Sequence, residues 1–221
     1  GDAVLLAENL NMRIKTVPIQ NQVDACLETF RADPEMAALP EGVPEENIQA
    51  RLRMLDLMYY ANKSQGLVLN TGNKTELALD NCTIYGDMVG GFSVLGDVDK
   101  DRVFHLARYI NQRAGKEVIP VSTIERVPSA ELKPGQIDAM VMGADPATIA
   151  PLVREIIENK LTFREACDQF GSQFGEDLIF RTFKKIDRSE WKRRQAAPAI
   201  RVTPHAFGNG RSAQTEKTIF G

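Results

Sequence analysis

The apolar run Leu67–Leu69 is followed at once by Asn-Thr-Gly-Asn and then by a helical pattern over residues 74–79. Where a strand ends at such a turn and a helix follows, the turn leaves a space at the end of the strand that a ligand can occupy. In parallel α/β sheets, ligands bind at these corners, outside the carboxyl ends of the strands. Core packing does not require the polar side chains of Thr71 and Glu76 at this place. The stretch therefore predicts a parallel α/β fold with a ligand site at residues 70–76.

The segment before this corner has the pattern of crossover elements. Apolar residues recur at helical spacing over residues 2–10 and 22–32, and residues 13–19 alternate like a short strand that stops at Pro18. The polar, proline-rich connector 33–44 is expected to be mobile. The order of helices and strands implies a parallel sheet with crossovers.

A long helix leads up to the corner. Pro44 is expected at its first position, and Glu45 and Glu46 lie in its first turn, where the helix dipole favours acids. Gly66 is expected to end it. Downstream, residues 80–97 contain four glycines and are expected to form a loop over a site. Further helices are expected at 99–112, 145–159, 162–170 and 176–195, a loop at 125–138, and an irregular tail at 196–221.

Composition restricts the classes of function. The chain has 221 residues, a net charge of −3 and no run of about 18 apolar residues, so neither nucleic acid nor a membrane is an expected partner. The first ten residues lack the basic start and cleavage site of a signal peptide. The three cysteines have no C-x-x-C spacing and are expected to be reduced thiols of a cytoplasmic protein. The only histidines, His105 and His205, are far apart in sequence, which argues against a histidine metal site.

Several stretches, taken together and in order, resemble the synthetase domain of NAD synthetases, closest to the glutamine-dependent form. The stretches are PEENIQARLRM, LVLNTGNKTELAL, TIYGDMVGGFSVLGDVDK, VPSAELKPGQID, EWKRRQAAP and HAFGNGR. The resemblance implies a three-layer α/β sandwich with a parallel sheet, of the adenine nucleotide alpha hydrolase-like (ATP pyrophosphatase) type. It also implies a homodimer. The implied reaction uses ATP to adenylate the pyridine carboxylate of deamido-NAD, after which ammonia displaces AMP, and NAD, AMP and pyrophosphate are formed.

The resemblance also implies roles for particular residues. Glu76 matches the magnesium carboxylate. Lys100 and Asp87 match the catalytic residues, and Lys100 also matches the phosphate-binding lysine. Thr71 and Ser129 match residues that contact ATP. Such chemistry needs Mg²⁺ and cations around the triphosphate, because adenylation leaves negative charge on the departing pyrophosphate.

The implied deamido-NAD site consists of Asn47, Arg51, Asp87 and Lys192. Each of these residues also has an ordinary interpretation. Asn47 and Arg51, one helical turn apart, are typical of two solvated neighbours. Glu76 alone would be a common first-turn acid, and Asp87 and Ser129 would be turn or cap residues. Only their ordered occurrence with the other stretches favours the functional interpretation.

The chain departs from the family in two ways. It contains no Ser-Gly-Gly-x-Asp-Ser loop, the pyrophosphate-binding element that follows the first strand in the family. The resemblance therefore describes a partial domain over 1–221, without the first strand, that loop and the glutaminase domain. Either the chain is a fragment or it is a degenerate paralogue. We favour the fragment because the other site residues persist, and we expect this chain alone to be inactive. The alternative function is that of an inactive member that binds nucleotide weakly or serves as a dimerisation partner.

The second departure is the pair Asp80 and Asn81, where the family usually has glycine and an aromatic residue; Asp138 and Ala139 likewise stand where it usually has Asp-Glu. A carboxylate at position 80 would repel the pyridine carboxylate of deamido-NAD if the two faced each other. We therefore predict that Asp80 turns outward or pairs with a cation such as Lys74 or Lys192. The nitrogen source, ammonia or glutamine, stays open.

Overall fold

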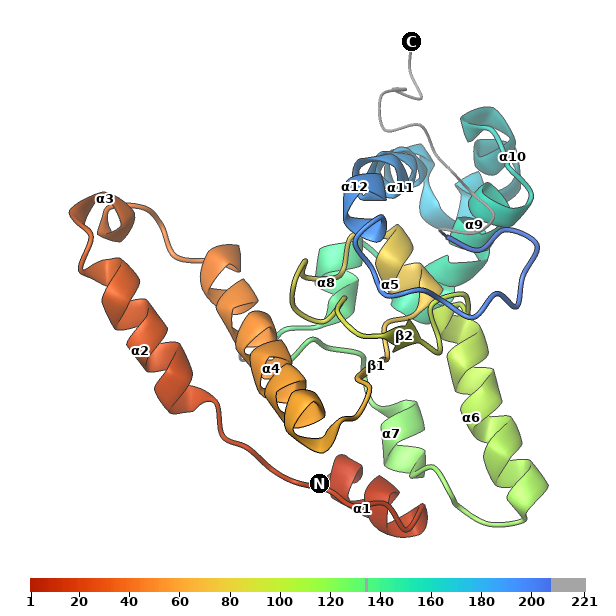
Figure 1. Cartoon of the computed structure of the whole chain (residues 1–221). Helices are drawn as coiled ribbons and strands as arrows, with labels where there is room; N and C mark the ends of the chain where they lie inside the picture. The colour runs from red at the N-terminus through yellow and green to blue at the C-terminus, as the bar shows by residue number, and fades with distance from the viewer. Residues whose placement is uncertain (134, 208–221) are drawn as a thin grey trace.

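The computed structural model describes residues 1–133 and 135–207. A body of helices surrounds a short sheet, and α2 and α3 lie beyond α4, away from that body (Figure 1). In chain order the elements are α1 (Asp2–Asn9), α2 (Gln20–Arg31), α3 (Pro34–Ala37), α4 (Val43–Ser64), β1 (Leu69–Asn70), α5 (Lys74–Ala78), β2 (Phe92–Ser93), α6 (Lys100–Ala114), α7 (Val121–Glu125), α8 (Asp138–Met142), α9 (Pro146–Glu158), α10 (Phe163–Phe174), α11 (Glu176–Arg188) and α12 (Glu190–Arg193).

The predicted helices of the N-terminal segment are confirmed, but the predicted strand at 13–19 is wrong. No strand forms there, and residues 11–18 are all exposed, so no neighbouring strand covers them. Pro18 also lacks the N–H group that a sheet ladder needs. The connector 33–44 is partly helical, because the Asp33 side chain accepts the Glu35 N–H (2.9 Å) and starts α3.

Both ends of α4 differ by one position from the prediction. The helix begins at Val43, so Pro44 takes its second position. It ends at Ser64, and Gln65 rather than Gly66 has the left-handed conformation, with φ at 52°. Pro44 still fits this place because a first-turn N–H has no partner within a helix.

The sheet is parallel, as predicted, but small. β1 pairs with β2 in the register Leu69 to Phe92 and Asn70 to Ser93. Ser93 also bridges in parallel to Ala199, so part of the tail lies beside β2. The remaining tail residues from 208 onward are outside the described part of the chain.

The predicted loop at 80–97 is present, except that residues 92 and 93 form β2. The Gly91 N–H donates to the Val68 carbonyl (2.9 Å). A Cβ on Gly90 would lie 3.1 Å from the Asn70 nitrogen, and one on Gly91 would lie 2.0 Å from a Leu67 methyl carbon. These glycines therefore let the loop approach β1 closely.

The core lies between α5, α9, α10 and α11. Asp145 begins α9 by accepting the N–H groups of Ala147 and Thr148, and Pro146 follows it. Thr162 and Glu165 form the capping box that begins α10. The fully buried apolar side chains include Leu79, Ile149, Leu152, Val153, Ile156, Ile157, Ile179 and Ile186. This core supports the helix that follows the corner at residues 70–76.

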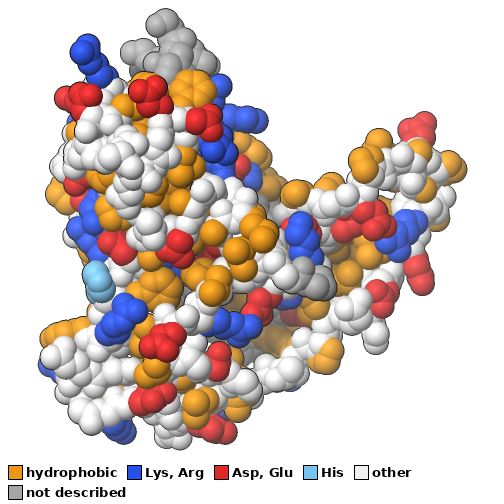
Figure 2. All heavy atoms as spheres, turned by 180° about the vertical axis from the view of Figure 1, so that it is seen from behind, with side chains coloured by type: hydrophobic (Ala, Val, Ile, Leu, Met, Phe, Trp, Pro, Cys, Tyr) orange, Lys and Arg blue, Asp and Glu red, His pale blue; other side chains and the backbone are white. Residues whose placement is uncertain are grey.

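Figure 2 shows that hydrophobic side chains are also exposed on this molecule, around a hollow between the body and the outlying helices. Those in the C-terminal half of α4 are Leu55, Leu57, Met58, Tyr59 and Tyr60, each between 37% and 61% exposed. No helix among residues 1–133 and 135–207 is long and apolar enough to cross a membrane.

Replacing Leu152 by alanine tests the core. The side chain is fully buried, so Leu152→Ala should lower the free energy of unfolding by about 2–5 kcal/mol. Leu39→Ala is the matched control because Leu39 is 60% exposed, and its effect should stay within about 0.5 kcal/mol. Urea unfolding followed by circular dichroism measures both. Equal losses for the two variants would contradict this placement of the core.

Candidate functional site

The corner between β1 and α5 is held by local side chains. Asn70 accepts the Gly72 N–H (2.9 Å) and donates to the carbonyls of Asp87 (2.5 Å) and Val89 (3.2 Å). Asn73 accepts the Glu76 N–H (3.1 Å), and Glu76 accepts the Asn73 N–H (3.0 Å). This reciprocal capping box starts α5 and fixes the direction of the Glu76 carboxylate.

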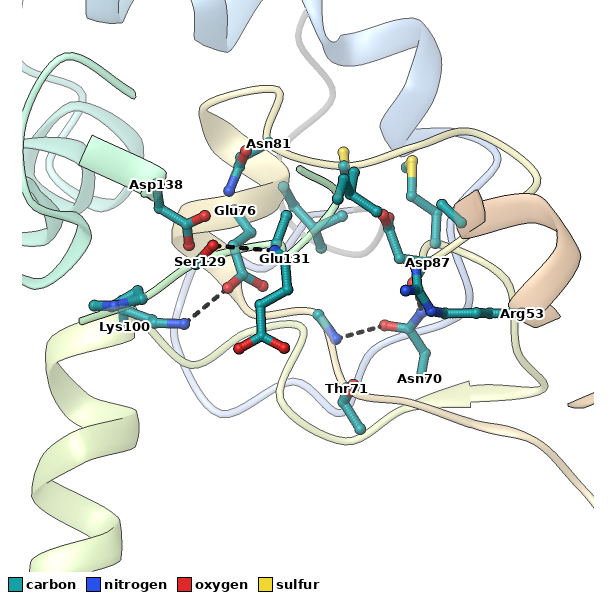
Figure 3. Close-up of a pocket in the computed structure, with 18 of the residues that line it drawn as sticks. Arg53, Asn70, Thr71, Glu76, Asn81, Asp87, Lys100, Ser129, Glu131 and Asp138 are labelled. Atoms are coloured by element: carbon teal, nitrogen blue, oxygen red, sulfur yellow. Dashed lines mark hydrogen bonds and ion pairs between the residues drawn. The ribbon is translucent and has the colours of Figure 1, made fainter. Parts of the chain in front are cut away.

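A cavity of about 700 Å³ opens beside the corner. Its wall includes five of the eight predicted site residues, Thr71, Glu76, Asp87, Lys100 and Ser129 (Figure 3). Apolar side chains line another part of it: Ala50, Met54, Leu57, Val68, Leu69, Leu77, Met88, Val89 and Phe104. A pocket with an apolar wall and a few converging polar groups is the usual form of a small-molecule site.

Glu76 and Lys100 form the central ionic contact of the cavity. The Lys100 Nζ lies 2.9 Å from Glu76 Oε1, and both side chains are about one-fifth exposed. Lys100 is the first residue of α6, and its N–H donates to the Thr75 hydroxyl (3.1 Å). The positive end of the α6 dipole and the Lys100 ammonium therefore lie together, an arrangement that favours a bound anion.

Three further carboxyl groups line the same cavity, those of Asp87, Glu131 and Asp138, and burial affects the two aspartates. Burial raises the pKa of Asp138, the Glu76 charge adds to this, and Lys100 and a hydrogen bond from Asn81 oppose it. Burial also raises the pKa of Asp87, against the hydrogen bond from the Thr83 N–H (2.8 Å). Figure 3 shows Asp138 and Asn81 close to Glu76, whose carboxylate is directed toward Lys100. The cavity thus concentrates acids that a bound cation would stabilise.

Cys82 also lines the cavity. Burial raises the pKa of this thiol to about 12, with the Asp87 charge adding to the effect. It is therefore protonated at neutral pH, and a thiolate nucleophile is not available here. All three cysteines are free, as predicted.

Ser129 lines the cavity, but its hydroxyl already has partners. It donates to the Gln136 carbonyl (2.5 Å) and accepts the Glu131 N–H (3.0 Å). These bonds shape the loop between α7 and α8. A phosphate that bound this hydroxyl would compete with them.

Three predicted residues, Asn47, Arg51 and Lys192, do not line the cavity. They support the segment around residues 80–85 from outside. Asn47 accepts a hydrogen bond from the Thr83 hydroxyl (2.7 Å), Arg51 donates to the Ile84 carbonyl (3.2 Å), and Lys192 donates to the Cys82 carbonyl (3.2 Å).

The predicted pairing of Asp80 is confirmed. Its Oδ1 lies 2.8 Å from the Lys192 Nζ. The other suggested partner, Lys74, binds Asp97 instead. Asp80 also has a left-handed φ of 62°, which non-glycine residues seldom adopt.

Seven polar lining residues were not among the predicted site residues: Arg53, Asn70, Asn81, Thr123, Arg126, Glu131 and Asp138. Arg53 could have been found, because Ala50, Arg53, Met54 and Leu57 share one helical face. Asp138 keeps the aspartate of the family's usual Asp-Glu pair, in which Ala139 is the departure, and no local pattern in the sequence shows that Asp138 lies near Glu76.

Asp138→Asn tests the raised pKa. The folded-state pKa lies above the unfolded value, so the folded chain binds more protons and loses stability as pH rises from about 3.9 through the folded pKa. The variant should therefore melt at a higher temperature than the parent at pH 7, and the difference should shrink toward pH 4. The control is Asp177→Asn, because Asp177 is a surface residue with 82% of its side chain exposed. A lower melting temperature for Asp138→Asn at pH 7 would contradict the effect of burial.

Known proteins resemble the chain over nearly its whole length. A family model described as NAD synthase matches residues 1–196. The glutamine-dependent NAD(+) synthetase of Synechocystis is 40% identical over 212 residues, which cover 95% of this chain and 36% of the relative. The enzyme of the same description from Thermotoga maritima is 37% identical and is covered to 35%. The chain thus spans about a third of the length of these relatives.

Solved structures agree with this. A glutamine-dependent NAD+ synthetase from Acinetobacter baumannii, in complex with ADP, aligns with a TM-score of 0.55 at 34% identity and covers 96% of this chain and 36% of its own. An NMN synthetase from Francisella tularensis aligns with a TM-score of 0.62 at 26% identity and covers 84% and 68%. These neighbours share the adenine nucleotide alpha hydrolase-like fold, here represented by helices around a small parallel sheet. With its family match over residues 1–196, the chain belongs to the NAD synthase family.

Proposed function

We propose that this chain is the nucleotide-binding part of a ligase that uses ATP to amidate deamido-NAD. The observation that carries the proposal is the Glu76–Lys100 pair, 2.9 Å apart, at the positive end of α6 inside the cavity. ATP as the nucleotide is supported by the ADP complex of the A. baumannii relative. In this reaction the carboxylate oxygen attacks the α-phosphorus, pyrophosphate leaves, and ammonia then displaces AMP from the adenylate.

Lys100 and the N-terminus of α6 bind the phosphates in this proposal. Both place positive charge where the leaving pyrophosphate gathers negative charge, and such preorganised groups are a major source of rate enhancement. The apolar wall, which includes Leu57, Met88 and Phe104, suits the purine ring. Thr71 and Ser129 also line the cavity, and in the proposal they contact the nucleotide, Ser129 by exchanging one of its present hydrogen bonds.

Glu76 would hold Mg²⁺. No group of three or more histidine, cysteine, aspartate or glutamate side chains in the described part of the chain forms a metal site. That fits Mg²⁺, which usually takes only one or two carboxylates and fills its other positions with phosphate oxygens and water. When bound, the ion would neutralise phosphate charge and polarise the transferred group. Glu76 can present Oε1 by releasing Lys100, because its other oxygen holds the Asn73 N–H.

Asn47, Arg51 and Lys192 support the deamido-NAD side of the site. Their contacts all fall on residues 80–85, next to Asp87 on the cavity wall. In the proposal Asp87 contacts both substrates, and burial raises the pKa of its carboxyl group above the ordinary value. The nitrogen arrives as ammonia, supplied either directly or by a glutaminase unit.

The second candidate is a member of the family that binds nucleotide without turnover. The observation that favours it for the 221-residue chain is the lack of a Ser-Gly-Gly-x-Asp-Ser stretch in the sequence. Removing a preorganised donor costs about 100- to 1,000-fold in rate. We also place the protein in the cytoplasm, in keeping with its free thiols.

The deciding experiment compares this chain with a chimaera. In the chimaera, the chain replaces the matching segment of the Synechocystis synthetase, which supplies the rest of that protein. With ATP, Mg²⁺ and ammonia, the chimaera should convert deamido-NAD to NAD, and the isolated chain should bind MgATP without turnover. Deamido-NMN is assayed in parallel because of the NMN synthetase relative. If the chimaera folds but makes no adenylate and binds no nucleotide, the proposed function is wrong.

Glu76→Gln in the chimaera should lower the rate of pyrophosphate release at least about 100-fold, because a metal ligand contributes several kcal/mol in the transition state. Stability should change by only about 0.3–1 kcal/mol, the usual effect of a first-turn acid. Glu165→Gln is the matched control, since Glu165 caps α10 in the same way but lies outside the cavity wall. Normal activity in Glu76→Gln would leave Glu76 as a capping residue alone.

We further propose that α4 forms a homodimer interface. The helix exposes Leu55, Leu57, Met58, Tyr59 and Tyr60, a larger apolar area than a monomer normally leaves uncovered. Sedimentation at micromolar concentration should show a dimer, and Leu55→Glu should shift it to a monomer. Leu39→Glu, at an exposed leucine outside α4, should leave the dimer intact. A monomeric parent chain would contradict this interface.

A further inference from the structure

Three consecutive residues of α5 contact the segment that leads into α6. Lys74 binds Asp97 (2.9 Å), Thr75 accepts the Lys100 N–H (3.1 Å), and Glu76 binds the Lys100 ammonium (2.9 Å). The proposed function uses only the last of these contacts. The Lys74–Asp97 and Thr75–Lys100 contacts hold the two segments that carry Glu76 and Lys100, so they determine where the Glu76–Lys100 ion pair forms.

Lys74 is the innermost member of this set. Its side chain is fully buried, and lysine is almost never so unless paired. The ammonium has three partners, Asp97 (2.9 Å), Glu158 (2.9 Å) and the Thr203 hydroxyl (2.8 Å). An ammonium has three N–H donors, so each of them has a partner. Lys74 does not line the cavity and cannot itself contact a nucleotide there.

Asp97 extends the same unit to the tail. It is fully buried, and its Oδ2 accepts the N–H groups of Val202 (2.8 Å) and Thr203 (2.7 Å). The Thr203 hydroxyl donates to Asp97 Oδ1 (2.8 Å) and accepts from Lys74. A segment more than 100 residues away in the chain is thereby fastened to the residues next to Glu76 and Lys100.

Packing alone does not account for this arrangement. Replacing a buried ion pair by apolar groups is often neutral or stabilising, because the charges must first lose their water. An ion pair with several hydrogen bonds fixes the orientation of the backbone segments that carry it, whereas apolar packing constrains that orientation less. Here the segments whose orientation is fixed are the first turn of α5, which carries Glu76, and the first residue of α6, Lys100.

We propose that Lys74 is a positioning residue: through Asp97 and Thr203 it holds the Glu76–Lys100 pair in the geometry that binds MgATP, and it makes the segment at Val202 and Thr203 part of the frame of the site. The nucleotide in this statement rests on the proposed function. The connection between the segment at Val202 and Thr203 and Lys100 does not depend on the proposed function.

Two measurements test the proposal on the 221-residue chain. The first is the affinity for MgATP by calorimetry. The second is amide hydrogen exchange by NMR at Lys100, Val202 and Ile186, the last lying in the buried part of α11. Lys74→Met removes the ammonium, and Thr203→Val removes only the hydroxyl between Lys74 and Asp97. Thr182→Val is the matched control, because Thr182 is also buried and its hydroxyl donates to the Leu178 carbonyl, on α11.

Thr203→Val should weaken MgATP binding about 3- to 10-fold and Lys74→Met at least about 30-fold, while Thr182→Val should leave it within about twofold. In both site variants, exchange should accelerate at Lys100 and Val202 at least about tenfold more than at Ile186. Equal acceleration at all three amides would mean that Lys74 only stabilises the fold, and the proposal would be wrong.

Other outcomes are also decisive. If Lys74→Met does not fold, Thr203→Val and its control still separate a local effect from a global one. Unchanged affinity in Thr203→Val, with Val202 exchanging faster and Lys100 unaffected, would show that the tail is fastened without positioning the site. If the parent chain binds no MgATP, the proposed function fails in this chain, and the exchange at Lys100 still decides the positioning role.

Discussion

The buried ammonium of Lys74 is the interaction on which the organisation around the cavity depends. An isolated charge in such a place would be too costly to keep, so the chain must bring partners to it from elsewhere. Asp97 comes from the loop after β2, Glu158 from the end of α9 and Thr203 from the tail. One lysine therefore determines how three distant segments meet beside the corner after β1.

The cavity wall carries slightly more acids than bases, and two ion pairs form on it, Glu76–Lys100 and Arg126–Glu131. Glu76, Asp87 and Asp138 share its wall, and burial raises the pKa of the two aspartates. The Lys100 ammonium forms its ion pair with Glu76. In the proposed function, a cation that arrives with a polyphosphate would take the place of Lys100 at Glu76, and Lys100 would bind the phosphates.

Much of this could be predicted from the sequence, and the reasons for the failures are physical. The helices are marked by strong local signals, such as Pro146 after Asp145 and the capping box from Thr162 to Glu165. The prediction of a strand at 13–19 was wrong because an alternation of apolar and polar residues does not by itself provide a neighbouring strand to pair with. Thr71 and Glu76 were predicted because ligand sites follow strand ends, and both line the cavity. The Lys74–Asp97 pair and the approach of Asp138 to Glu76 were missed, since they join residues that are far apart in sequence and have no local pattern.

The two carboxylate oxygens of Glu76 have different partners. One holds the Asn73 amide and keeps the start of α5 in place, and the other holds Lys100. Exchange of Lys100 for a metal ion would thus alter one oxygen and leave the helix start untouched. In the proposed function, only the Lys100 side chain would have to move for Glu76 to change from its ion pair with Lys100 to a metal-bound state. Such an exchange requires no backbone rearrangement, so it can occur on the timescale of side-chain rotation.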